Sequence, residues 1–354
     1  MKMINEIAIG ERLIGHGHPV YLVAEIGSNH SRKKNVVREL VDRAAEAGFD
    51  AVKFQTYDPE EVFSGKVRTG DVQLKSLYGD RSWWEVARDH VLLPREWFGE
   101  MFAYARSKSL EVFSTVHSCD DAKFVLAFDP PAFKVASIDV SNTDFLKCLA
   151  AFAKPIILST GLHQEEEIGS AVATLKKAGN DRLILLHCIS NYPPLTENLN
   201  LKNIIMLNKT FGVPVGFSDH SPDNMAAATA VALGACLIEK HVTLDRKSWG
   251  VDHHFALEPE GMKDLVARVR QTEEMLGSYQ RVLSEDELEV REMARRSIVA
   301  RSDIKKGEIL SRENLKLSRP GSGIHPRHLD ELIGKKASVD IASEDLVRWD
   351  DVDL

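Results

Sequence analysis

The sequence has few cysteines and no long apolar run. Only four of its 354 residues are cysteine, and no two form a Cys-x-x-Cys pair. They are Cys119, Cys148, Cys188 and Cys236. This wide spacing argues against a disulfide framework and a structural zinc, so we expect four small, buried apolar side chains. No stretch reaches the roughly 18 apolar residues of a membrane span, and Glu6 and Glu11 interrupt the region where a secretion signal needs an apolar core. We therefore expect a cytoplasmic protein with no membrane partner.

The chain also lacks an excess of basic residues. Its 45 Lys and Arg residues face 53 Asp and Glu residues, a net charge of −8 with histidine neutral. This balance argues against a general nucleic-acid binder, although a local basic pocket is compatible with it. The 44% hydrophobic and 28% charged content is that of a folded globular protein. The length exceeds the roughly 250 residues of an ordinary β/α barrel, which leaves room for a second module.

Short apolar runs rich in β-branched residues recur along the chain, and most are followed by a segment with helical periodicity. Amphipathic segments at 36–47, 223–233 and 261–276 predict helices between or after these runs. Strands that alternate with helices pair in parallel, and eight such units predict a closed (β/α)8 TIM barrel. The eight runs are 20–27, 51–56, 111–116, 132–137, 155–160, 183–190, 213–219 and 237–243.

Two regions depart from the simple β/α alternation. Residues 57–110 are too long for one connection and predict a loop and two helices inserted after the second strand. The barrel pattern stops near residue 283, giving a predicted catalytic domain over 1–283. A Ser-x-x-Glu capping box then begins a charged helical linker over 284–296. Residues 297–354 contain short strand and turn signals with no long helix, which indicates a separate small domain.

Polar side chains stand at the carboxyl end of every predicted strand. Parallel strands buried on both faces are normally almost all apolar, and the active site of a TIM barrel lies at this end. A single strand-end serine is more often a helix cap, but polar ends on all eight strands predict a charged pocket and an enzyme. These residues are Glu25, Lys53, Gln55, Ser114, Thr115, Lys134, Ser137, Ser159, Thr160, His187, Ser190, Ser218, Asp219, His220, Glu239 and His241.

The residue types narrow the chemistry. Lys53 and Lys134, among several hydroxyl groups, suit a small phosphorylated or carboxylated anion. His220 and His241 could hold one divalent metal with open coordination positions, or could instead bond neighbouring carboxylates. Glu25 is the candidate to contact a reacting water or hydroxyl. These residues indicate a metal-assisted reaction of an anionic substrate.

At these positions the chain resembles the sialic acid synthase family, whose members condense phosphoenolpyruvate (PEP) with an N-acylated hexosamine. The C-terminal segments ARRSIVARSDIKKGEI, RPGSGIHP and ELIGKKASVDI look like the antifreeze-protein-like SAF domain, of β-clip fold, that ends this family. The resemblance covers essentially the whole chain. The barrel motifs are AEIGSNH, AVKFQT, FKVASIDVSN, ILSTG, LLHCIS with a following YP, VGFSDHS, AVALGACLIEKHVTLD and VDHHFALEPEG.

The resemblance implies roles for individual residues. His220 and His241 would hold Mn2+ or Mg2+, and Glu25 would act at the reacting centre with Lys53 and His241. Arg319 would reach the barrel of a partner subunit in a domain-swapped homodimer and contact the sugar's N-acyl group. The other sugar contacts would be Gln55, Tyr192, Glu239 and Asp252. The PEP contacts would be Lys53, Thr115, Lys134, Ser137, Ser159 and Ser218.

The implied reaction joins PEP to an N-acetylmannosamine-type sugar and gives a nonulosonic (sialic) acid and phosphate with C–O cleavage. N-acetylmannosamine 6-phosphate and the 2,4-diacetamido-trideoxyhexoses that lead to legionaminic or pseudaminic acid are alternative acceptors. The chain departs from the family at STVHS (114–118), where relatives often read STPFD. We expect His117 to be a surface loop residue, with an altered sugar contact as the alternative.

Two other classes of function compete with this one. A Schiff-base aldolase would use Lys53, Lys134 or Lys240 as its nucleophile. A carbohydrate-binding module would be built from the fragment 284–354, which would then bind sugar by itself.

Overall fold

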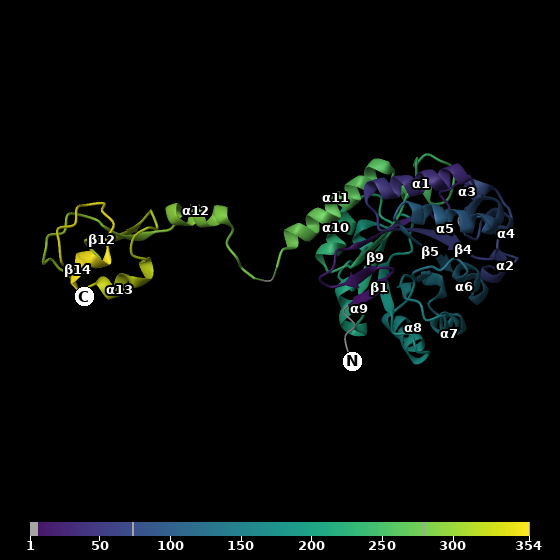
Figure 1. The fold of residues 1–354 in the computed structure, drawn as a ribbon, viewed down its shortest axis with the longest axis horizontal. Coiled ribbons are helices and arrows are strands. Elements are labelled where there is room, and N and C mark those ends of the chain that lie inside the picture. The colour runs from purple at the N-terminus through teal and green to yellow at the C-terminus, as the bar shows by residue number, and fades with distance from the viewer. Residues whose placement is uncertain (1–5, 73, 279, 354) are drawn as a thin grey trace. The chain divides into compact units, whose positions relative to one another are not determined.

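The computed structural model describes residues 6–72, 74–278 and 280–353 (Figure 1). The chain divides into two compact units, one up to Gly277 and one from Ser278 onward. No helix in the described part of the chain is long and apolar enough to cross a membrane.

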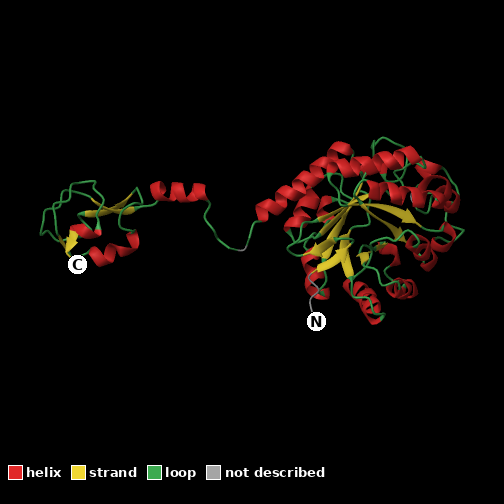
Figure 2. Cartoon of the chain, viewed as in Figure 1, coloured by secondary structure: helices red, strands yellow, loops and turns green. Residues whose placement is uncertain are grey.

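The first unit is the predicted (β/α)8 barrel. Eight parallel strands close in the order β10-β3-β4-β5-β6-β7-β8-β9, and helices surround the ring (Figure 2). Each strand lies within one of the eight predicted runs, so the barrel is confirmed. The strands are β3 (Tyr21–Glu25), β4 (Ala51–Thr56), β5 (Glu111–Val116), β6 (Phe133–Val135), β7 (Ile156–Ser159), β8 (Leu183–Cys188), β9 (Val215–Asp219) and β10 (Leu237–His241).

The helices that cover the ring follow from their apolar faces. In α1 (Lys34–Ala47) the spacing of Val37, Leu40 and Ala44 buries one face against the barrel, and Gly48 ends the helix with a left-handed φ of 92°. The segment predicted over 36–47 is this helix. The others are α5 (Phe98–Ser107), α6 (Cys119–Leu126), α7 (Thr143–Ala151), α8 (Glu165–Lys177), α9 (Asn203–Phe211), α10 (Met225–Ala232) and α11 (Pro259–Leu276).

The insertion between β4 and α5 forms a small apolar cluster of its own. Tyr57, Tyr78 and Trp83 are buried at its centre. Of the two helices predicted within 57–110, the second is α5, and the first is present as α4 (Trp83–Val86) with the π-helical turn that follows it. The elements that precede α5 are short turns that pack around these aromatic rings. They are α2 (Pro59–Val62), α3 (Lys75–Tyr78), α4 (Trp83–Val86), a π-helical turn (Ala87–Val91) and a 3-10 turn (Arg95–Trp97).

A hairpin that the sequence did not predict precedes the barrel. Strands β1 (Glu6–Ile9) and β2 (Arg12–Gly15) pair antiparallel. Ile7, Ile9 and Ile14 join the buried cluster formed by Tyr21 and other residues of the barrel strands. A four-residue strand holds too few alternations to stand out as a pattern.

The second unit is small and has its own core, which includes Ile298, Leu310 and Val347. It begins with α12 (Glu285–Ala294), where Ser284 and Glu287 form the expected capping box. Its other elements are β11 (Ser297–Ala300), β12 (Leu315–Ser318), a 3-10 turn (Pro326–His328), α13 (Leu329–Leu332), β13 (Lys336–Ala337), a 3-10 turn (Trp349–Asp351) and β14 (Val352–Asp353). Strands β11 and β12 pair antiparallel, as do β13 and β14.

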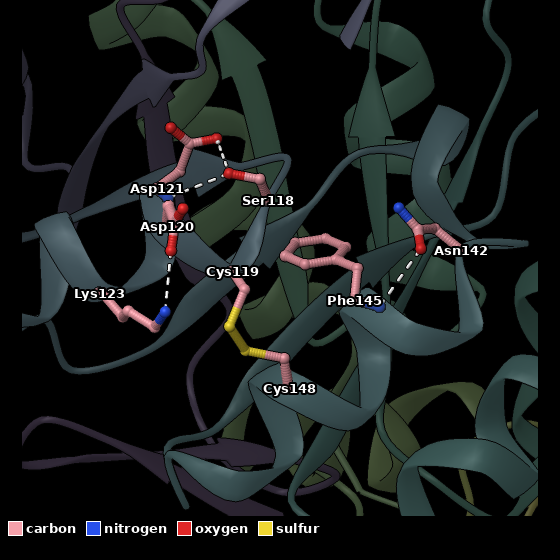
Figure 3. Close-up of a disulfide and its surroundings, with 8 residues drawn as sticks. All are labelled: Ser118, Cys119, Asp120, Asp121, Lys123, Asn142, Phe145 and Cys148. Carbon is pink, nitrogen blue, oxygen red and sulfur yellow. Dashed lines mark hydrogen bonds and ion pairs between the residues drawn. A yellow bond between two sulfur atoms is a disulfide. The ribbon is translucent and has the colours of Figure 1, made fainter. Parts of the chain in front are cut away.

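The expectation of four unpaired cysteines is wrong. Cys119 and Cys148 form a disulfide, with their Cα atoms 6.0 Å apart (Figure 3). Cys119 is the first residue of α6 and Cys148 lies in α7, so tertiary packing of these helices brings together two residues that are 29 positions apart. Cys188 and Cys236 are free and buried, as expected.

Candidate active site

The carboxyl ends of the barrel strands surround a cavity of about 360 Å³. All eight strands, or the loops directly after them, contribute to its wall. Most residues that the resemblance implied line this cavity, which brings the candidate PEP, sugar and metal groups together. These are Glu25, Lys53, Gln55, Thr115, Lys134, Ser137, Ser159, Tyr192, Ser218, His220, Glu239 and His241.

Four of the polar strand-end residues have structural partners instead. One is Thr160, whose hydroxyl donates to the Leu186 carbonyl oxygen at 3.0 Å and which does not line the cavity. Ser114 bonds Thr56 hydroxyl to hydroxyl at 2.7 Å, and the His187 ring is 2.7 Å from the Leu199 carbonyl oxygen. Asp219 pairs with Lys240, a residue on the outer side of the barrel. None of Ser114, His187 or Asp219 is among the residues that line the cavity.

A buried network of opposite charges forms the floor of the cavity. The Lys53 ammonium lies 2.6 Å from Glu25 Oε2 and donates to Thr115 Oγ1 at 2.8 Å. It also lies 3.6 Å from Glu239 Oε1, which accepts a 3.1 Å hydrogen bond from Ser218. Lysines at this depth need charged or hydrogen-bonding partners, and the neighbouring strands supply them.

The second lysine stands beside the same glutamate. Lys134 Nζ donates to Ser159 Oγ at 2.7 Å and lies 3.8 Å from Glu239 Oε1. The alternation along each strand explains this convergence, because Lys53 and Gln55 share one face of β4, and Glu239 and His241 share one face of β10. Two ammonium groups and several hydroxyls therefore surround one small volume.

Burial and the neighbouring ammonium groups together set the protonation of the two carboxylates. Burial raises the pKa of Glu25 to about 7, although the neighbouring Lys53 ammonium opposes the change. Burial also acts to raise the pKa of Glu239, but the ammonium groups of Lys134 and Lys53 outweigh it and hold that pKa below its ordinary value. Glu239 is thus the permanent carboxylate of the floor, and Glu25 can hold or release a proton near neutral pH.

The two lysines differ in the same way. Burial lowers the pKa of Lys134. For Lys53, burial is outweighed by the carboxylates of Glu239 and Glu25, which raise its pKa. Lys53 is therefore a permanent cation. The charged form of Lys134 is disfavoured by burial, and an incoming anion would stabilise it.

His220 and His241 face one another at the wall formed by β9 and β10. Their ring centroids are 5.4 Å apart. Burial lowers the pKa of His220 to about 4 and that of His241 to about 3, so both rings are neutral at pH 7, the form that binds metal. His220 Nδ1 bonds the Ile189 carbonyl oxygen at 2.9 Å, which leaves Nε2 as the basic nitrogen.

The donor set fits an open divalent-metal site with two imidazole ligands. His241 Nδ1 is buried without a hydrogen-bond partner among the described residues, as is Glu239 Oε2. Such orphaned acceptors at a cavity wall are suited to a cation. In the described part of the chain, no three His, Cys, Asp or Glu side chains lie close enough together to enclose a metal. Water and substrate would therefore fill the remaining coordination positions of a metal held by His220 and His241.

Lys240 faces away from the cavity, between the two inward residues Glu239 and His241. Its ammonium donates to Asp219 Oδ2 at 2.6 Å, to the Ser221 carbonyl at 2.6 Å and to the Asp223 carbonyl at 2.8 Å. Lys240 does not line the cavity. It therefore secures the segment that carries His220, and it is not placed to attack a substrate.

Asp252 lies just outside the lining residues. Ser28 Oγ donates to its Oδ2 at 2.9 Å, and this oxygen is 3.9 Å from His241 Nδ1. Glycine at position 27 leaves room for both carboxylates, because a Cβ there would lie 2.9 Å from Glu25 Oε1 and 3.4 Å from Asp252 Oδ2, and its φ of 49° favours glycine. Arg319 is an exposed residue of the second unit.

His117 is not the surface loop residue that we expected. Its side chain is 8% exposed and lines the cavity, with Nδ1 2.8 Å from Asp139 Oδ2. The signal that could have found it is strand alternation, since His117 follows Thr115 by two residues and so shares its inward face.

The helices after β5 and β6 hold this side of the cavity in place. Ser118 caps α6 by accepting a 3.1 Å hydrogen bond from the Asp121 amide, and Asn142 caps α7 by accepting one of 3.2 Å from the Phe145 amide. Figure 3 shows both caps beside the Cys119–Cys148 disulfide, which joins the two helices. The loops that carry His117 and Asp139 are therefore cross-linked through the helices that follow them.

A closed parallel barrel with ionisable groups converging at its carboxyl end is the architecture of a TIM-barrel enzyme. Comparison with known proteins identifies the family of TIM-barrel enzymes to which the chain belongs. The NeuB family profile matches residues 40–281 and the SAF domain profile matches residues 295–353. The chain belongs to the NeuB family and ends in a SAF domain, which confirms the resemblance seen in its motifs.

Similar proteins support this assignment over nearly the whole length. A pseudaminic acid synthase of Campylobacter jejuni is 38% identical, with 94% of this chain and 96% of the relative covered. An N,N'-diacetyllegionaminic acid synthase of Legionella pneumophila is 34% identical, with 96% of each chain covered. The crystal structure of an N-acetylneuraminic acid (sialic acid) synthetase from Leptospira borgpetersenii in complex with citrate is 31% identical. It matches with a TM-score of 0.72 over 82% of this chain and 96% of that one. The protein is a synthase-type enzyme.

Proposed function

We propose that this enzyme condenses PEP with the open-chain form of an N-acylated aminohexose to give a nonulosonic acid and phosphate. One observation carries the proposal: two buried lysines, a set of hydroxyls and two neutral imidazoles line one cavity of about 360 Å³. The lysine side suits a small anion, and the imidazole side suits a metal-bound carbonyl.

The bond changes of the reaction indicate a role for the lysines, the hydroxyl groups and Glu25. C3 of PEP forms a bond to the aldehyde carbon of the sugar, whose oxygen takes up a proton and becomes a hydroxyl. A water adds at C2 and loses a proton, and the tetrahedral intermediate then releases phosphate with cleavage of the C2–O bond to leave a ketone. Lys53 and Lys134, with Thr115 and the serines, would hold the carboxylate and phosphate in position throughout. Glu25, poised near neutral pH, would hold or accept the proton of the attacking water.

His220 and His241 would hold Mn2+ or Mg2+. The bound cation would supply Lewis-acid polarisation of the sugar aldehyde. Gln55, Tyr192, Glu239 and Asp252 remain the candidate sugar contacts of the barrel. By resemblance, Arg319 would complete the sugar site from the partner subunit of a domain-swapped homodimer.

An N-acetylmannosamine-type sugar is the first acceptor to test. The names of the relatives favour a second one, a 2,4-diacetamido-trideoxyhexose, because the C. jejuni protein is named for pseudaminic acid and the L. pneumophila protein for N,N'-diacetyllegionaminic acid. N-acetylmannosamine 6-phosphate is the third. A cytoplasmic location stays a prediction.

The test is a panel of purified hexosamines with PEP, scored for phosphate release and for product mass. We expect PEP-dependent phosphate with at least one acceptor, abolished by EDTA and restored by Mn2+. A Schiff-base aldolase would instead keep its activity in EDTA and be trapped by borohydride with pyruvate. No phosphate release with any acceptor would refute the proposal.

A further inference from the structure

His117 stands above the anion-binding floor of the cavity. It follows Thr115 by two residues, and Thr115 is the partner of Gln55 in the register of β4 and β5. Two residues of extended chain advance roughly 6–7 Å, so His117 lies about one layer nearer the mouth than Thr115. Its neighbour there is Tyr57, whose ring centroid is 5.1 Å from that of His117.

The imidazole of His117 is held from two sides. Asp139, whose side chain is 11% exposed, lies 2.8 Å from Nδ1, and the Tyr57 ring packs edge-on against the imidazole. Because a carboxylate can only accept, it assigns the hydrogen to Nδ1, so Nε2 is the ring nitrogen left to accept a hydrogen bond. No group in the described part of the chain bonds Nε2, while His117 lines the cavity.

The position in the ring of strands indicates which ligand meets this nitrogen. Lys53 and Lys134, which suit PEP, lie on the floor, so the ligand above them is the acceptor sugar. The barrel order places β3 and β4 between β5 and the strand of His241, and β9 with His220 lies one strand further. A sugar whose aldehyde lies at the imidazole pair therefore extends its other end toward β5.

We propose that His117 is a specificity-determining residue, whose Nε2 accepts a hydrogen bond from a hydroxyl or amide N–H near the far end of the acceptor. This inference rests on the proposed function. Asp139 is the positioning residue, because it fixes the ring and its tautomer. An acceptor without the distal donor leaves the enclosed Nε2 unpaired, and so binds less well.

Two substitutions separate the functions of the two ring nitrogens. His117→Asn keeps an amide at the position of Nδ1, where it can still bond Asp139, and removes the group at Nε2. His117→Gln places an amide near the position of Nε2. We expect H117N to raise the KM for the acceptor about tenfold, which corresponds to about 1.4 kcal/mol, with the KM for PEP and the Tm unchanged. H117Q should recover much of the loss.

The matched control is His328→Asn. His328 is a second histidine paired with a carboxylate, at 2.9 Å from Glu331, and it lies in the second unit. H328N should leave both KM values unchanged.

Acceptor analogues supply the second readout. Removing a distal hydroxyl or acylamino N–H from the accepted sugar should raise the KM of the wild type, and H117N should no longer distinguish the two sugars. The polyol made by reducing the acceptor cannot react, and with PEP present it should raise the Tm of the wild type more than that of H117N.

An unchanged acceptor KM in H117N would overturn the inference while leaving the proposed function intact. Equal rises in both KM values together with a lower Tm would also overturn it, since that is the pattern of a purely structural residue. A wild-type protein without PEP-dependent phosphate release would refute the proposed function and this inference together.

Discussion

Replacing Lys240 by methionine tests how the structure holds His220. The side chain is 1% exposed, and its ammonium bonds Asp219 Oδ2 and the carbonyls of Ser221 and Asp223. Methionine retains the apolar stem and removes the charge together with all of these hydrogen bonds. The segment 219–223 then loses its side-chain link to β10, while the backbone pairing of Asp219 with residue 240 remains.

The expected cost follows from what the substitution leaves behind. Asp219 is 0% exposed, and without Lys240 its side chain keeps one hydrogen bond among the described residues, from the Ser221 amide at 2.8 Å. Breaking a buried ion pair by removing one partner typically costs about 3–5 kcal/mol. Since domains are stable by roughly 5–15 kcal/mol, K240M should lose a large fraction of the barrel's stability.

Urea unfolding followed by tryptophan fluorescence measures this loss, because four of the five tryptophans lie in the barrel unit. The double variant with Asp219→Asn and Lys240→Met removes both charges and should recover part of the stability. Mn2+ titration followed by electron paramagnetic resonance should show weaker binding in K240M, because His220 lies inside the loosened segment. A loss below about 1 kcal/mol with unchanged Mn2+ affinity would refute the reasoning.

Three further outcomes follow from the same structure. Reducing the Cys119–Cys148 disulfide, which closes a loop of about 30 residues, should lower the free energy of unfolding by about 3–4 kcal/mol, and equal urea midpoints with and without reductant would contradict this. Folding raises the pKa of Glu25 from 4.5 to about 7, so between these pH values the folded protein binds more protons than the unfolded chain. The stability that Glu25 contributes therefore falls as the pH rises from about 4.5 to 7. Glu25→Gln should remove that slope from urea midpoints measured across this range, and an unaltered slope would assign it to another group. Arg319→Ala should raise the acceptor's KM with an unchanged Tm, whereas an unchanged KM would remove the SAF domain from the site.

The sequence predicts the barrel well because buried parallel strands have a distinctive pattern. Each strand is a short apolar run that ends in polar residues, and eight of them repeat with helices between. The polar ends also predict most of the cavity wall, since the fold alone brings the carboxyl ends of the strands together. Lys53 and Glu239 needed no further information to be placed there.

Other features depend on tertiary packing that no local pattern reveals. Cys119 and Cys148 meet only because α6 and α7 lie side by side, and their spacing carries no mark of the bond. Lys240 and Lys53 are both lysines near the end of an apolar strand. Strand alternation directs Lys240 outward to Asp219 and Lys53 inward to Glu25. His117 was misplaced for a related reason. Its departure from the family pattern suggested a variable surface position, while its parity with Thr115 pointed inward.

The local charge of the cavity explains how an acidic chain can favour an anion. Lys53 and Lys134 bring two positive charges to the floor, and Glu239 brings one negative charge. The protonation of Glu25 sets the net charge of the floor. The floor is neutral when Glu25 is ionised, and it carries one net positive charge when Glu25 is protonated. An incoming phosphate would favour that proton further, since a nearby negative charge raises the pKa of a carboxyl and of an ammonium alike. In a site this enclosed such local terms outweigh the bulk charge of −8, so anion affinity should be governed by Glu25 and Lys134 rather than by the surface of the protein.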